Sequence, residues 1–272
     1  MAYKRILTIQ DISCVGQCSM TVALPILSAC GHETCILPTA VLSTHTGGFG
    51  KPVVQHLQAD GMWKHWQAQG ITFDAVLVGY LGSVRAIETV SEILDHMLAP
   101  GGVSIVDPAM ADHGKLYSGF DADYAQAMQK LCEKADILIP NITEAAMMAG
   151  MEYRADFDID YILELLDRLP GKDVVLTGVG FSPDRTGAVV RRAGEDTFFH
   201  TPKVGKSYSG TGDIFAACFT GALMQGKTME EAASLACRFT LRAIEATAAA
   251  PAHWYGVKFE TVLPWLIQNL FD

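Results

Sequence analysis

Short apolar runs that alternate with amphipathic segments are the feature that most constrains the fold of this chain of 272 residues. Each run is nearly continuous, as in strands buried on both faces of a sheet, and the segments between carry apolar residues three and four positions apart, the helical period. This alternation predicts βαβ units and a mainly parallel sheet with helices on both faces. The predicted strands are 5–9, 33–37, 74–78, 103–106, 136–139 and 173–176, and the clearest predicted helices are 84–98, 121–134 and 159–169.

The last third of the chain departs from the alternation. Residues 185–201 form two polar-flanked apolar segments around Ala193–Asp196, which predicts a hairpin at the sheet edge. Helical patterns alone follow it, at 214–225, 229–249 and 259–271. No internal repeat or Pro-, Gly- or Ser-rich linker divides the sequence, so we expect residues 1–272 to form a single three-layer α/β/α domain.

Composition excludes several classes of protein. Half of the residues are hydrophobic and 18% are charged, which is typical of a globular chain and not of a disordered one. Thirty acidic against 20 basic residues give a net charge of −10, which argues against a nucleic-acid partner. The seven cysteines are an odd number without zinc-site spacing, and no apolar stretch has the length of a membrane helix or a signal peptide. We therefore expect a cytoplasmic protein with no membrane partner.

The strongest local motif is Ser209-Gly210-Thr211-Gly212-Asp213, a glycine-rich turn that leads directly into a helical pattern. Free backbone N–H groups at a helix start attract anions, and glycine lets a phosphate approach the backbone closely. Asp213 would repel phosphate, unless its function is to remove a proton from an attacking hydroxyl. Ordinary helix capping by Thr211 or Asp213 explains the same motif when it is considered alone.

Polar residues also follow four of the predicted strands, where ligands bind in open α/β sheets. Asp107 and Asp112 are carboxylates that a hydrated magnesium could use, or residues of a solvated loop. Asn141 and Glu144 have the spacing of a capping box. The other two strand ends supply a hydroxyl beside a glycine at Thr177, and an aromatic ring between glycines at Tyr80.

In combination, these motifs resemble the ribokinase-like kinases, and among them the pyridoxal (vitamin B6) kinase branch. The resemblance runs over nearly the whole chain, and five motifs carry it in order: Ser43-Thr44-His45-Thr46-Gly47, Gly79-Tyr80, Asp107-Pro108-x-Met110-x-Asp112, Pro140-Asn141-x-x-Glu144 and Gly210-Thr211-Gly212-Asp213. It implies a ribokinase-like α/β fold and transfer of the γ-phosphoryl group of ATP to the 5′-hydroxymethyl group of pyridoxal, pyridoxamine or pyridoxine.

The resemblance also implies a role for each site residue. Asp213 would accept the hydroxyl proton, and the N–H groups of Gly210, Thr211 and Gly212 would hold the charge on the transferred phosphoryl group. Asp112, Asn141, Glu144 and Thr177 would contact ATP, while Asp107, Asp112 and Glu144 would orient Mg²⁺. Asp11, Thr46, Tyr80 and Tyr117 would line the ring site, with Tyr117 on a flap over the substrate. Members of this family usually form homodimers, so the resemblance implies a homodimer. Whether the reaction requires K⁺ stays open.

Asp11 is the main departure, because pyridoxal kinases usually carry serine directly after the glutamine that ends the first strand. Asp11 would pair with a protonated ring nitrogen or an amine, which favours pyridoxamine or an aminopyrimidine, or it would cap the following helix. Two alternative functions stay open: a hydroxymethylpyrimidine (phosphate) kinase of thiamine synthesis, and a catalytically weak B6-binding protein. Lys203 and Lys206 precede the glycine turn and are expected to be surface residues.

Overall fold

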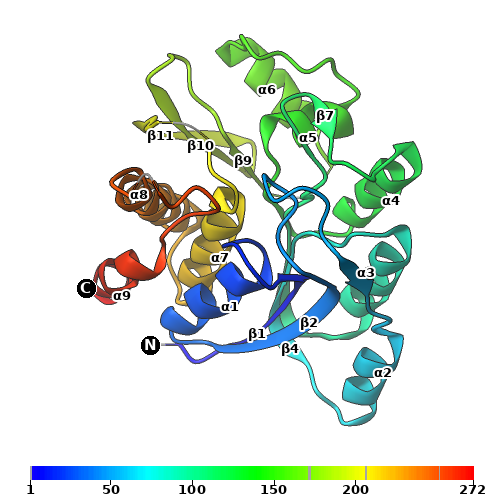
Figure 1. Ribbon diagram of the computed structural model, residues 1–272. Coiled ribbons are helices and arrows are strands. Elements are labelled where there is room, and N and C mark those ends of the chain that lie inside the picture. Colours follow the sequence, from blue (N-terminus) through cyan, green and yellow to red (C-terminus); the bar gives the residue numbers. More distant parts are fainter. Residues whose placement is uncertain (1, 171–172, 206, 251) are drawn as a thin grey trace.

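One large twisted sheet forms the centre of the computed structural model, which describes residues 2–170, 173–205, 207–250 and 252–272 (Figure 1). Within these ranges nine strands form the sheet in the order β11-β10-β9-β8-β5-β4-β1-β2-β3. The pairs from β9 to β2 are all parallel, whereas β10 and β3 are antiparallel to their neighbours, and β10 pairs with β11 as a hairpin. The mainly parallel sheet expected from the apolar runs is confirmed.

The strands agree with the predicted runs in position, but several differ in length. The strands are β1 (Arg5–Ser13), β2 (Glu33–Leu42), β3 (Val54–His56), β4 (Phe73–Val78), β5 (Leu98–Val106), β8 (Ile137–Leu138), β9 (Asp173–Thr177), β10 (Arg185–Arg192) and β11 (Glu195–Pro202). A separate two-stranded sheet consists of β6 (Ala111–Asp112) and β7 (Lys115–Leu116). Strand β1 continues past the predicted end at Ile9 because a bulge between Gln10 and Ile12 lets its polar end stay paired with β2.

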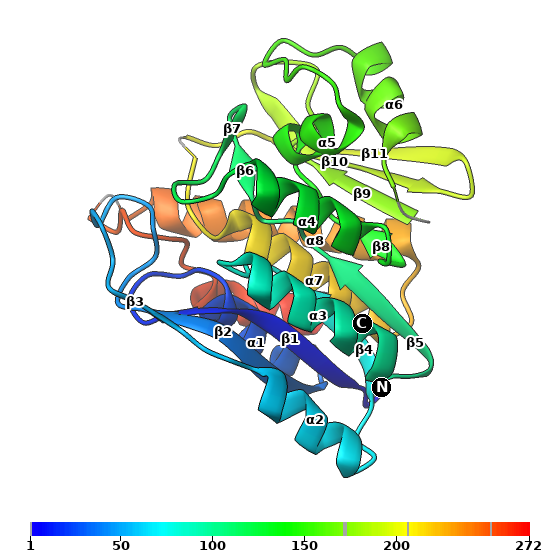
Figure 2. The same ribbon diagram turned by 90° about the vertical axis from the view of Figure 1, so that its right-hand side faces the viewer.

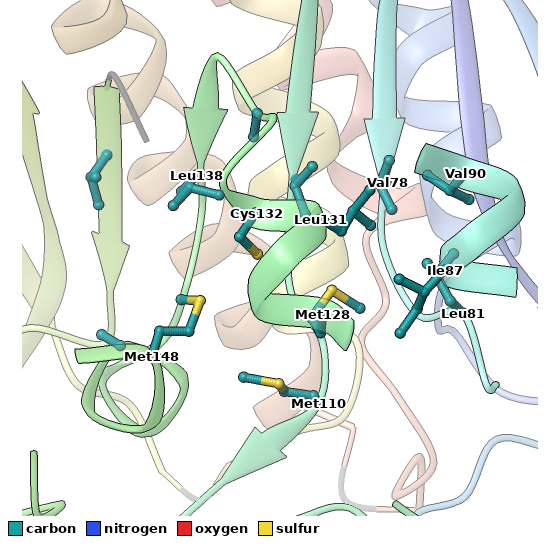
Figure 3. Packing of buried hydrophobic residues seen from close by; sticks show 14 of the residues in the cluster. Val78, Leu81, Ile87, Val90, Met110, Met128, Leu131, Cys132, Leu138 and Met148 are labelled. Atoms are coloured by element: carbon teal, nitrogen blue, oxygen red, sulfur yellow. The ribbon is translucent and has the colours of Figure 1, made fainter. Parts of the chain in front are cut away.

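Helices cover both faces of the sheet, as expected (Figure 2). One face packs against α2 (Asp60–Ala68), α3 (Val84–His96), α4 (Ala122–Cys132), α5 (Ile142–Ala149) and α6 (Ile159–Arg168). The other packs against α1 (Met20–Ala29), α7 (Thr211–Met224), α8 (Met229–Ala248) and α9 (Leu263–Phe271). Figure 3 shows the first interface, where Met128, Leu131 and Cys132 of α4 pack with residues from the ends of β4 and β8. Among the described residues, no helix combines the length and hydrophobicity needed to cross a bilayer.

The parallel strands place their carboxyl ends along one edge of the sheet, which is where the candidate site lies. Segments that follow β1, β4, β5, β8 and β9 meet there with the start of α7. The β6–β7 hairpin, whose turn is His113-Gly114, is the short flap expected between Asp112 and Tyr117. Both turn residues have positive φ values, 49° and 76°, as a two-residue hairpin loop of this kind requires.

Candidate active site

The glycine turn begins α7. Gly210 is the N-cap residue with φ 86°, and a Cβ placed on it would lie 2.0 Å from the backbone oxygen of Gln17. Only glycine fits a positive φ with so close a neighbour. The first N–H groups of α7, beginning at Thr211, have no carbonyl partner within the helix and stay available for an anion. The predicted anion site therefore lies at the start of a helix, and the loop 14–19 packs against it.

Asp213 lies in the first turn of α7 and is half-buried. Its Oδ2 accepts a hydrogen bond from the backbone N–H of Ser19, at 2.8 Å. Burial raises its pKa to about 7, the Ser19 bond opposes that shift, and the charges of Asp107 and Asp11 add to it. A carboxyl group with this pKa is suited to exchange a proton with an alcohol near neutral pH.

Asp107 follows β5 and faces the same turn. Its Oδ1 accepts from the N–H of Ala109 at 3.1 Å, and its Oδ2 lies 3.8 Å from the position of a Cβ on Gly212. Burial and the neighbouring charge of Glu144 raise the pKa of Asp107 well above its usual range. The end of β5 and the start of α7 are thus brought together as the sequence predicted.

Glu144 is almost fully buried and holds the loop after β5 in place. Its Oε1 accepts from the N–H groups of Met110 at 2.9 Å and Ala111 at 3.3 Å, and its Oε2 accepts from that of Asn141 at 2.9 Å. Burial raises its pKa to about 7, against the effect of these bonds, and the charge of Asp112 adds to the rise. Glu144 and Asn141 form the capping box of α5 that the spacing indicated, and Glu144 has this structural role in addition.

The predicted nucleotide contacts lie at neighbouring strand ends. Asn141 accepts from the N–H of Glu144 at 3.0 Å and donates through Nδ2 to the carbonyl of Ala111 at 2.8 Å. Thr177 is bridged to Asn141 and donates through Oγ1 to the carbonyl of Pro140 at 3.2 Å. Asp112 is exposed on the flap, where its Oδ1 accepts from the N–H of His113. Lys203 is exposed, as expected, and Lys206 lies outside the described residues.

The aromatic residues of the predicted ring site lie on two sides of Phe120. The Tyr80 ring stacks on Phe120 with centroids 5.3 Å apart, and the Tyr117 ring is tilted toward Phe120 at 6.5 Å. Burial raises the pKa of Tyr117, and the charges of Glu144, Asp107, Asp112 and Asp213 raise it further. Sequence reasoning missed Phe120, although its spacing of three from Tyr117 was a usable signal.

Thr46 is exposed on the loop after β2, where a Cβ on the adjacent Gly47 would lie 2.8 Å from Oγ of Ser209. This contact brings the Thr46 loop to the glycine turn. Asp11, in contrast, is buried where the β1–β2 pairing is irregular, and its Oδ2 accepts from the Ser13 hydroxyl at 2.9 Å. The alternative that Asp11 caps the next helix is wrong, because the N-cap residue of α1 is Ser19. Ser19 itself was missed by sequence reasoning.

The carboxylates at this edge of the sheet are oxygen donors of the kind that magnesium binds. Among the described residues, no three His, Cys, Asp or Glu side chains converge into a complete set of metal ligands. The groups present are nevertheless hard oxygen donors, and Asp107 keeps one oxygen directed at the glycine turn. Magnesium usually retains several waters and binds through one or two carboxylates together with substrate phosphates. The donor set fits such a hydrated ion, bound partly by the nucleotide.

Comparison with known proteins agrees with this geometry. Residues 27–257 match the family model described as phosphomethylpyrimidine kinase. The structure superposes on the pyridoxal kinase of Lactobacillus plantarum with a TM-score of 0.90 and 32% identity, covering 98% of each chain. A Bacteroides thetaiotaomicron protein, provisionally described as a phosphomethylpyrimidine kinase and solved with pyridoxal, gives a TM-score of 0.87 and 32% identity over 100% of this chain and 96% of that one.

Curated relatives are more distant in sequence. The pyridoxine/pyridoxal/pyridoxamine kinase of Bordetella avium is 27% identical over 257 residues, which are 89% of this chain and 85% of that protein. The chain spans 52% of the length of a Saccharomyces cerevisiae relative and 63% of a Haemophilus influenzae hydroxymethylpyrimidine/phosphomethylpyrimidine kinase. The family model covers most of the chain, so the chain belongs to the phosphomethylpyrimidine kinase family, and it has the ribokinase-like fold of the pyridoxal kinase on which it superposes.

Proposed function

We propose that this protein is a vitamin B6 kinase that transfers the γ-phosphoryl group of ATP to the 5′-hydroxymethyl group of pyridoxal, pyridoxamine or pyridoxine. The observation that carries the proposal is the position of Asp213, a carboxylate with a raised pKa in the first turn of a helix whose free N–H groups form an anion site. The Lactobacillus plantarum pyridoxal kinase and the pyridoxal-bound Bacteroides protein support the choice of acceptor.

In the proposed reaction, Asp213 accepts the proton of the hydroxymethyl group while the alcohol oxygen forms a bond to the γ-phosphorus. The bond between that phosphorus and the bridging oxygen breaks, and ADP leaves with the electron pair. The N–H groups at Gly210, Thr211 and Gly212 stabilise the charge on the transferred group. The flap with Tyr117 and the stacked Tyr80 and Phe120 cover the ring and exclude water.

Magnesium is the proposed cofactor, held through water by Asp107, Asp112 and Glu144, and when bound it would neutralise the charge of the ATP phosphates. Asn141 and Thr177 are the proposed contacts to those phosphates. Thr46 and Tyr80 are the proposed contacts to the ring. Asp11 fits a ring contact least well, because its carboxylate is buried and already bonded to Ser13. A homodimer, a cytoplasmic location and a single domain over residues 1–272 also stay predictions.

The second candidate is a hydroxymethylpyrimidine (phosphate) kinase, because the matching family model and the Haemophilus influenzae relative have this activity in their descriptions. The B6 acceptor is favoured by the L. plantarum structure, whose superposition covers 98% of both chains. Both alcohols would be positioned by the same turn, so residues around the ring must decide between them.

A phosphorylation assay tests the proposal. Purified protein with Mg-ATP is offered pyridoxal, pyridoxine, pyridoxamine and hydroxymethylpyrimidine, and ADP release and phosphorylated product are measured, the latter by mass spectrometry. We expect kcat/KM for at least one B6 alcohol to exceed that for hydroxymethylpyrimidine by about tenfold or more, since differential binding of two rings is worth one or more kcal/mol. Pyridoxal 5′-phosphate, which lacks the free alcohol, is the negative control. A higher kcat/KM for hydroxymethylpyrimidine would replace the proposal by the second candidate, and no turnover of any alcohol would favour the B6-binding protein.

A further inference from the structure

Ser19 lies between the half-buried carboxylate of Asp213 and the buried carboxylate of Asp11, and it has an unusual backbone conformation. Its φ is 54° and its ψ is −125°, in a region that residues with a side chain rarely occupy. Such a conformation persists only where the surroundings impose it, and it is enriched at functional sites. Ser19 is also 6% exposed, so its contacts are those of the protein interior.

The backbone of Ser19 joins three elements of the fold. Its N–H donates to Oδ2 of Asp213, and its carbonyl accepts from the N–H groups of Val22 and Ala23 as the N-cap of α1. An isolated antiparallel bridge also joins Ser19 to Ile12 at the end of β1. In the backbone conformation that Ser19 adopts, its N–H points at Asp213 while its carbonyl caps α1.

The Ser19 side chain lies beside the carboxylate of Asp11 and lowers the pKa of that group, and the same carboxylate accepts a hydrogen bond from the Ser13 hydroxyl at 2.9 Å. Asp11 lies at an irregularity of the β1–β2 pairing, where the single β1 residue between Gln10 and Ile12 stands opposite two residues of β2. Asp11 is 2% exposed, so its bond with Ser13 is sheltered from water. A buried carboxylate therefore lies beside the hydroxyl of Ser19, whose amide binds the proposed base.

We propose that Ser19 is a positioning residue for Asp213, whose amide fixes Oδ2 so that Oδ1 is presented to the acceptor alcohol, and that Asp11 holds Ser19 in the required left-handed conformation. Among the described residues, the structure records no hydrogen bond to Oδ1, which leaves that oxygen for the proton. The proposal rests on the proposed function in that Asp213 is the base. It gives Asp11 a role other than contact with the substrate ring.

A comparison of Ser19→Gly with Ser19→Ala distinguishes a positioning role of Ser19 from a merely structural one. Ser19→Gly keeps the amide donor and adopts the left-handed conformation without Asp11, whereas Ser19→Ala loses the hydroxyl beside Asp11 and retains the Cβ that disfavours that conformation. We expect Ser19→Ala to lower kcat about tenfold, since displacing a reacting group by an ångström or less can cost up to 10²-fold. KM for ATP and the alcohol should change less than twofold. Ser19→Gly should retain several times more of the wild-type kcat than Ser19→Ala.

A double-mutant cycle tests the role of Asp11. Asp11→Ala should lower kcat about tenfold in the wild-type background and less than twofold in the Ser19→Gly background, because glycine adopts the conformation without Asp11. Ser13→Ala, which removes the other hydroxyl bound to Asp11, is the matched control and should leave kcat within twofold. Melting temperatures of all variants are measured to confirm folding.

Two results would overturn the proposal: Ser19→Ala and Ser19→Gly with equal kcat, or Asp11→Ala with the same effect in both backgrounds. The second result, with a raised KM for the alcohol, would show that Asp11 contacts the ring. Failure of this proposal is distinct from failure of the proposed function. The latter is measured on the wild-type protein with the panel of alcohols, whereas the former is measured as ratios between variants on whichever alcohol the wild-type protein phosphorylates.

Discussion

Asp213 and Glu144 are two acidic residues in the first turns of two helices, yet the protein treats them differently. Burial raises the pKa of each to about 7. Glu144 is 1% exposed and accepts three backbone hydrogen bonds through both oxygens, whereas Asp213 is half-buried and accepts one, through Oδ2. Similar pKa values therefore arise in a carboxylate that is bonded through both oxygens and in one that is bonded through Oδ2 alone.

This difference indicates that the two carboxylates have different roles at the edge of the sheet. Glu144 ties the loop after β5, and with it the start of the flap, to α5, so it determines the shape of the site. Asp213 has bonding capacity left and lies beside the free N–H groups of α7, so it is suited to chemistry. A raised pKa alone does not separate the two roles, because structural networks also perturb pKa values. The bonding of each oxygen does.

The largest effect is expected for Asp213→Asn. The amide cannot accept the alcohol proton as a carboxylate does, so kcat should fall by about 10²–10⁴, the usual contribution of a general base. The Ser19 bond can be retained by the amide oxygen, so KM for ATP should change little and the melting temperature should not fall. Steady-state kinetics and thermal denaturation measure both. A variant with wild-type kcat would contradict the assignment of Asp213 as the base.

Gly210→Ala tests the Asp213 side of the site as a whole. The added Cβ would lie 2.0 Å from the Gln17 oxygen and would occupy a φ of 86°, so the turn must move. We expect kcat to fall about 10²-fold, as for a displaced reacting group, with a lower melting temperature. The control is Gly226→Ala, which has a φ of 95° but nothing within 4 Å of its added Cβ. If both variants lose kcat equally, the close approach of Gln17 is not what shapes the turn.

For Glu144→Gln we expect a loss of stability with a smaller loss of activity. One side-chain amide group would face backbone N–H donors, and leaving a buried donor unsatisfied costs about 1–3 kcal/mol. The free energy of unfolding should fall by that amount, and kcat by about tenfold through the displaced loop. Glu231→Gln is the matched control, because Glu231 forms the capping box of α8 at an exposed position and should change stability by about 0.5 kcal/mol or less. If Glu144→Gln lost more kcat than Asp213→Asn, Glu144 rather than Asp213 would be the more important group for the reaction.

Much of the fold could be predicted from the sequence because buried parallel strands and amphipathic helices leave local patterns. The strand ends were less accessible. Strand β1 extends to Ser13 because Asp11 and Ser13 are paired with each other in the interior, and no local pattern shows that a polar residue is satisfied in this way. The edge strand β3 was missed because it has only three residues, all exposed, and gains its structure from pairing with β2.

In the candidate site, too, features that depend on residues far apart in the sequence could not be predicted. The glycine turn and the capping box at Asn141 were predictable because each is a motif of adjacent residues that acts through its own backbone. Ser19 was not, because its partner Asp213 is 194 positions away and its left-handed conformation cannot be inferred from a serine. The interior role of Asp11 depends on the irregular pairing of β1 with β2, which has no signal in the sequence.

The smallest expected effect is on the pH dependence of stability, and it separates the two carboxylates most directly. The pKa of Asp213 is about 7 in the folded protein and near 3.9 in the unfolded chain, so the folded state binds more protons between these values. The stabilising contribution of this group is complete below pH 3.9 and is lost as the pH rises through 7. Removing the carboxylate should therefore stabilise the ligand-free protein at pH 8 and have little effect near pH 4.

We expect the unfolding free energy of Asp213→Asn to exceed that of the wild-type protein by about 1–2 kcal/mol at pH 8, less than the full shift implies because the side chain keeps contact with water. Near pH 4 most of this difference should be lost. Glu144→Gln should be less stable than the wild-type protein at both pH values, because its three lost or weakened bonds outweigh the gain from removing a buried charge. Denaturant unfolding at the two pH values gives all four differences. If Asp213→Asn is the less stable protein at pH 8, the Ser19 bond contributes more than the desolvation of Asp213, and both carboxylates are then structural.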